Sequence, residues 1–116
     1  MEPLEIRRQL VFNLKRAESV YKNYLAEDQK FLHAKNLKKA NDRIIEILTN
    51  YNQNLPKALE NDMLLLLEHL EIWSERWIEL QQKLNPSLDD VFVFQNTHQF
   101  PKSAAQKIIN YVENNH

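Results

Sequence analysis

Residues 57–84 carry the feature that most constrains the fold, an unbroken alternation of apolar side chains at spacings of four and three. The apolar positions are Leu59, Met63, Leu66, Leu70, Trp73, Trp77, Leu80 and Leu84. Such spacing keeps them on one face of an α-helix, since a helix has about 3.6 residues per turn. A helix of this length is roughly 40 Å long. We therefore predict an all-α domain in which the other helices pack along it.

Three further segments show helical spacing of apolar residues, and Pro101 suits the first turn of the last one. The four predicted helices span residues 3–26, 28–52, 57–84 and 101–114, and the second of them begins between Asp28 and Asn36. Together they predict one domain over residues 1–116, a four-helix bundle whose first two helices form an antiparallel hairpin. A phenylalanine-rich strap over residues 85–100 precedes the last helix.

The chain contains no glycine and no cysteine. Walker loops, dinucleotide-binding turns and the G-x-S-x-G turn of serine hydrolases all need glycine, so these sites are excluded. The lack of cysteine excludes disulfides and thiolate metal sites. We expect asparagine to take the left-handed positions that end helices. The candidates are Asn50, Asn52, Asn54 and Asn85.

No segment has the character of a membrane span or a secretory signal. The hydrophobic runs all fall short of the roughly 18 residues that a span requires, and the N-terminal MEPLEIRR lacks the apolar stretch of a signal peptide. We therefore expect a cytoplasmic protein that does not contact membranes.

The strap contains the least helical sequence of the chain, VFVFQNTHQFP over residues 91–101. Alternating valine and phenylalanine favours a strand, whereas NPSLDD over residues 85–90 has the asparagine, proline and acids of a helix start. We expect a short helical turn or an irregular strap, because a single strand would find no partner. The phenylalanines either plug the core or bind another protein. The candidate partner-binding residues here are Phe92, Phe94, His98 and Phe100.

The helix predicted over residues 57–84 has more apolar surface than its core-facing seam needs. Leu64, Leu65 and Leu67 lie beside or beyond the seam. Either other helices surround them, or they form a face for a second copy or for another protein. The predicted function is a non-enzymatic protein–protein interaction module, of adaptor, accessory-subunit, immunity or regulatory type. The expected partner is another protein or the chain itself, as a homodimer through helix 57–84.

Charge is divided unequally, with a net charge of +4 over residues 1–43 and −5 over residues 44–116. The basic residues of the first part form helical lines at Arg8, Lys15, Lys22, Lys35, Lys39 and Arg43. Such lines suit a phosphate backbone, which makes a nucleic-acid-associated regulator the alternative function. The pattern shows no aromatic residue interleaved with the cations, and mutual neutralisation within the bundle is the simpler interpretation.

An acidic ridge follows helix 57–84 at spacings of three or four, formed by Glu68, Glu71, Glu75 and Glu79. Ridges of this kind can bind hard cations or perform acid–base chemistry, so a metal-dependent enzyme is a third and weaker alternative. More often they are solvated helix faces. No histidine has a metal-ligand spacing that its surroundings support, and we predict no catalytic residue, no metal and no cofactor.

Overall fold

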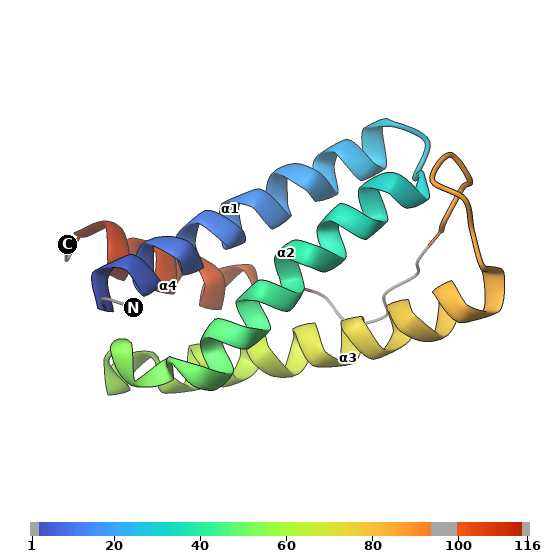
Figure 1. Cartoon of the computed structure of the whole chain (residues 1–116). Coiled ribbons are helices and arrows are strands. Elements are labelled where there is room, and N and C mark those ends of the chain that lie inside the picture. The colour runs from blue at the N-terminus through green and yellow to red at the C-terminus, as the bar shows by residue number, and fades with distance from the viewer. Residues whose placement is uncertain (1–2, 94–99, 115–116) are drawn as a thin grey trace.

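The computed structural model describes residues 3–93 and 100–114 (Figure 1). Its helices are α1 (Pro3–Ala26), α2 (Phe31–Asn50), α3 (Glu60–Leu84) and α4 (Lys102–Asn114). Two short 3-10 turns, η1 (Asn52–Asn54) and η2 (Lys57–Leu59), connect α2 to α3. The helices pack against one another, so the predicted all-α four-helix bundle is confirmed. None of the described helices is long and apolar enough to cross a membrane.

Neighbouring helices run antiparallel, and the two chain termini lie at the same end of the bundle (Figure 1). Both α1 and α3 pack on α2 and on α4, so α1 and α3 are diagonal partners. They also run in the same direction, because the chain reverses twice between them, once before α2 and once after it. The outer faces of α1 and α3 therefore lie on opposite sides of the molecule.

The seam of α3 is buried at its five central positions, Met63, Leu66, Leu70, Trp73 and Trp77. They contribute to two core clusters along the bundle axis. In the first cluster all four helices meet, and α4 supplies Ala105, Ile108, Ile109 and Val112. The second cluster lies where α4 does not reach, and it consists of Tyr24, Phe31, Ala34, Leu37, Trp73, Trp77 and Phe92. A residue of the strap thus occupies the place of a fourth helix.

Phe92 closes this second cluster from the strap and is fully buried, with 0% of its surface exposed. Its ring centroid lies 5.1 Å from that of Phe31 and 5.4 Å from that of Trp77. The backbone N–H of Phe92 donates to the carbonyl of Gln29 at 2.8 Å, and the Tyr24 hydroxyl donates to the carbonyl of Phe92. At this residue the strap is a core plug.

Helix α2 begins at Phe31, within the predicted range from Asp28 to Asn36 and three residues after its first position. Asp28 and Gln29 adopt left-handed conformations with φ of 62° and 51°, and Lys30 is extended, so a helix cannot start at Asp28. The cause is a contact with the strap, where the N–H of Phe31 donates to the carbonyl of Asp90 at 2.8 Å. Val91 also forms an isolated antiparallel bridge with Lys30. The expectation that an extended segment would find no partner is therefore wrong at this position.

The expectation that asparagine takes a left-handed conformation at a helix end is confirmed at Asn85, which has φ of 43°. It is wrong at Asn50, Asn52 and Asn54, because the described residues with positive φ are Asp28, Gln29 and Asn85. There a 3-10 turn reverses the chain instead.

The predicted ends of the last two helices also shift. Helix α3 starts at Glu60 instead of residue 57, because Pro56 is extended and a 3-10 turn follows it. Helix α4 starts at Lys102, one residue after Pro101. The interpretation of residues 85–90 as a helix start is wrong. Their turn is closed by the N–H of Ser87, which donates to the Asp90 carboxylate at 2.7 Å.

Candidate interaction surfaces

The outer face of α3 exposes two adjacent leucines. Leu64 is 56% exposed and Leu65 is 55% exposed, although both lie on the longest helix of the bundle. Each helical residue turns the side chain by about 100°, so burial of Met63 and Leu66 directs the two residues between them outward. Leu67 differs, because it is half-buried and packs against the first core cluster. Of the three leucines predicted to form a spare face, Leu64 and Leu65 provide it.

The acidic ridge continues from this leucine pair along the same helix. Glu68, Glu71, Glu75 and Glu79 are all exposed. Within the described residues, no group of three or more histidine, aspartate or glutamate side chains is arranged to hold a metal ion. The outer face of α3 is consequently apolar at Leu64 and Leu65 and anionic from Glu68 to Glu79.

The predicted basic residues are divided between two helices, and several have acidic partners. Lys15 lies 3.2 Å from Glu113, and Lys22 lies 3.3 Å from Glu18. The half-buried Arg43 pairs with Glu46 at 2.8 Å and donates to the side chain of Gln9. The exposed residues Arg8, Lys35 and Lys39 complete the set. The bundle thus neutralises part of the basic surface, as the simpler interpretation proposed.

Phe12 is the surface residue that the sequence interpretation missed. It is 64% exposed, the largest value among the large apolar side chains described. On α1 it lies four residues after Arg8, three before Lys15 and four before Arg16, so cations surround it on the same helix face. The expectation that no aromatic residue is interleaved with the basic line is wrong. The sequence could have revealed it, because Phe12 lies two residues from both Leu10 and Leu14. A position two residues from a buried helical residue faces away from the core.

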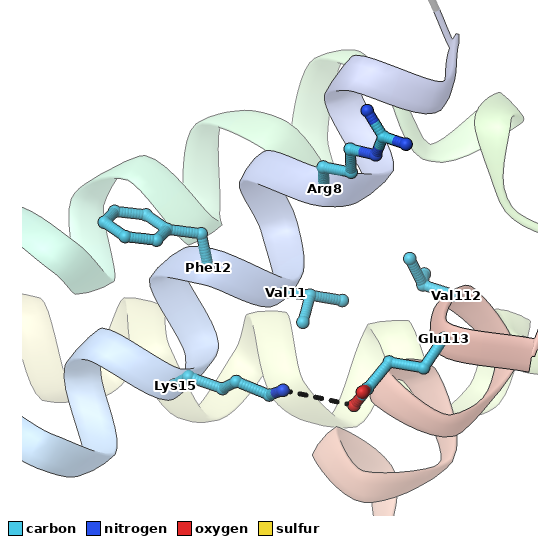
Figure 2. Close-up of a pocket in the computed structure, with 6 residues that line it drawn as sticks. All are labelled: Arg8, Val11, Phe12, Lys15, Val112 and Glu113. Carbon is cyan, nitrogen blue, oxygen red and sulfur yellow. Dashed lines mark ion pairs between the residues drawn. The ribbon is translucent and has the colours of Figure 1, made fainter. Parts of the chain in front are cut away.

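Beside Phe12, an open pocket of about 400 Å³ lies between α1 and α4 (Figure 2). The pocket is lined by Arg8, Val11, Phe12, Lys15, Val112 and Glu113. The buried Val11 and Val112 form its apolar base, and the ion pair between Lys15 and Glu113 spans one side. Phe12 extends away from Val11, toward the outside of the bundle (Figure 2). The pocket therefore borders the basic, aromatic face of α1.

The end of the bundle that Phe92 closes also has apolar side chains at its surface. They are Leu25, Leu32, Leu88, Val91 and Val93. Phe100 is 37% exposed and makes an edge-to-face contact with His69, at 5.4 Å between ring centroids. Phe94 and His98 lie outside the described residues. Of the four predicted strap residues, Phe92 offers no surface to a partner in this structure, and Phe100 offers part of its ring.

Comparison with known proteins gave no match: no protein-family model matches the chain, and no curated protein or solved structure is significantly similar to it.

Proposed function

We propose that this chain is a non-enzymatic protein–protein interaction module, and that the outer face of α3 is its main docking surface. The observation that carries the proposal is the pair Leu64 and Leu65, more than half exposed on a long, well-packed helix. Burying apolar surface stabilises a complex by about 25 cal/mol per Å². The helix backbone is already ordered, so binding requires no ordering of the main chain beneath the leucines.

The acidic ridge beside the leucines supports the same function, because charges around an apolar centre select a partner and speed its approach. Glu68 and Glu71 lie within two helical turns of Leu64 and Leu65. A partner that covers the leucines therefore meets negative charge on the C-terminal side of the contact.

The test is capture of a partner by the purified chain, followed by titration of the purified complex. We expect the double variant Leu64→Asp/Leu65→Asp to weaken binding at least about tenfold, because it places charge in the apolar centre. Leu84→Asp is the matched control, since Leu84 is 49% exposed at the other end of the same helix. Unchanged binding by a double variant that remains folded, as judged by circular dichroism, would contradict the proposal.

A second candidate function is a nucleic-acid-associated regulator, and Phe12 is the observation that favours it. Exposed aromatic rings among cations bind single strands by stacking on bases while the cations contact phosphates. It ranks second because Lys15, Lys22 and Arg43 already have acidic partners.

Fluorescence anisotropy with labelled single-stranded oligonucleotides tests this candidate. Binding should fall steeply with salt, because cations that contact phosphates release counterions. Phe12→Ala should weaken it by about 1–3 kcal/mol through lost stacking, whereas Leu65→Asp on the opposite face should leave it unchanged. Binding that is insensitive to salt, or to Phe12→Ala, would remove this alternative.

A further inference from the structure

We propose that the outer face of α3 binds the outer face of α1 of a second copy of this chain. This inference rests on the proposed function, because it names the partner of the same leucine surface. Phe12 of one copy would lie against Leu64 and Leu65 of the next. All three side chains are more than half exposed, and each face is flanked by charge of the opposite sign.

The charges of the two faces match in position as well as in sign. Relative to Phe12, the cations of α1 occur four residues before it, three and four residues after it, and ten residues after it. Relative to Leu64, the acids of α3 occur four and two residues before it, and four, seven, eleven and fifteen residues after it. All α-helices rise by about 1.5 Å per residue. Two parallel helices that align Phe12 with Leu64 would therefore bring together charges at equal offsets from these residues. The expected intermolecular pairs are those with equal offsets, Arg8 with Glu60 and Arg16 with Glu68.

The architecture of the bundle supplies the parallel orientation that this register requires. In each copy α1 and α3 run in the same direction and face opposite sides (Figure 1). A second copy placed beside the first by translation alone therefore presents its α1 parallel to the first copy's α3. Such a contact is heterologous, so each added copy leaves one unused α1 face and one unused α3 face.

The same geometry disfavours a symmetric contact between two α3 helices. Two copies of the ridge would bring glutamates of like charge together along the interface, at Glu68, Glu71, Glu75 and Glu79. The contact between α1 and α3 instead pairs opposite charges along its length. The homodimer predicted through helix 57–84 is thus replaced in this proposal by an asymmetric contact that uses the same helix on one side only.

Sedimentation velocity of the full chain tests the proposal. At low salt the weight-average sedimentation coefficient should rise between about 10 µM and 1 mM, the range expected for a small interface. It should fall back toward the monomer value at high salt, where exposed charges are screened. Phe12→Asp and Leu65→Asp should each remove the association, and Leu84→Asp should leave it intact. A wild-type chain that stays monomeric over this range would overturn the proposal.

Mixing the two blocked variants gives the sharpest result. The Phe12→Asp variant keeps an intact α3 face, and the Leu65→Asp variant keeps an intact α1 face. An equimolar mixture should therefore form dimers that do not grow further, although each variant alone is monomeric. A symmetric α3 contact predicts instead that the Phe12→Asp variant dimerises on its own, because its α3 face is intact, and that mixing adds no further association. Absence of dimers in the mixture would therefore reject the asymmetric contact.

A charge exchange tests the register. Arg16 belongs to α1 and Glu68 to α3, helices that are diagonal in the bundle, so coupling between the two residues reports a contact between copies. Arg16→Glu and Glu68→Lys should each weaken association several-fold, and the double variant should recover most of the loss. Additive losses would reject the proposed register.

The experiments distinguish failure of self-association from failure of the proposed docking function. If the wild type is monomeric while Leu64→Asp/Leu65→Asp still loses a captured partner, self-association is wrong and the proposed function stands. If copies associate but no variant of Leu64 or Leu65 affects any contact, both are wrong.

Discussion

The two halves of the bundle core are closed in different ways. At one end α4 covers the core with four buried aliphatic side chains, spread over about two helical turns. At the other end a strap covers it with one ring, that of Phe92, which packs on Phe31 and Trp77. A strap offers fewer side chains per unit length to a core than a helix does, so the side chains beneath it must be large. The comparison shows why the aromatic residues gather at that end.

The difference also concerns how the stabilising contacts are distributed. In the helix-closed half the contribution of any one residue is shared with its neighbours along α4. In the strap-closed half it depends on the Phe92 ring, on the backbone bonds that flank it and on the Tyr24 hydroxyl. Substitution of one core residue should therefore open the structure locally in the strap-closed half. In the helix-closed half the effect of one substitution should be spread along α4.

Phe92→Ala should have the largest effect, a loss of about 4 kcal/mol in the free energy of unfolding, because it opens a cavity under the strap. Urea denaturation measures the loss. Hydrogen exchange should show that amides near Phe31 lose protection before those of α4. Phe100→Ala is the control, with a smaller loss expected for a ring that is 37% exposed. Uniform loss of protection across the bundle would contradict the division of the core.

Tyr24→Phe should destabilise the chain by about 1.5 kcal/mol, because it leaves the buried carbonyl of Phe92 without its donor. Thermal unfolding checks the loss, with Tyr21→Phe as the matched control. Tyr21 stacks on Tyr24 at 6.3 Å between centroids but is half exposed, so its hydroxyl should matter little. If both variants unfold at the same temperature as the wild type, the hydroxyl does not secure the strap.

Ile108→Val should cost about 1 kcal/mol in the free energy of unfolding, as expected for one buried methylene group. Ile108 lies on the core-facing side of α4 and is fully buried. Because neighbouring side chains share the closure of this half, hydrogen exchange should change slightly along all of α4. A strongly local opening at residue 108 would show that this half, too, depends on single residues.

Leu64→Asp/Leu65→Asp should change the free energy of unfolding least, by no more than about 0.5 kcal/mol per residue, as is usual for surface positions. Both side chains project from the bundle, so a loss of binding in this variant can be assigned to the surface. Urea denaturation of the monomeric chain at low concentration checks this. A loss of several kcal/mol would mean that the leucines contribute to the fold.

Periodicity along the chain determined the helices and most of their inward faces. The seam through Leu66, Leu70, Trp73 and Trp77 is buried as its spacing predicts, since about 3.6 residues per turn aligns these positions in any helical context. The same periodicity predicts that Leu64 and Leu65 lie outside the seam. For this part of the candidate surface, local geometry was sufficient.

Local patterns could not determine features that depend on contacts between distant segments. Helix α2 starts at Phe31 because residues 29–31 pair with the strap some 60 positions later in the chain. Phe92 is buried because α4 is too short to cover that end of the bundle, and its sequence context fits a docking residue equally well.

The relation between the two outer faces was also decided by tertiary structure. The charges of both helices, the leucines of α3 and the phenylalanine of α1 are legible in the sequence, although Phe12 was overlooked. That these helices are parallel, diagonal and open to opposite sides follows only from how the four helices pack. Sequence alone determines what each helix face carries, because side-chain direction is a local property of the helix. The packing of the whole chain decides which faces stay open, because burial depends on segments that are distant in sequence.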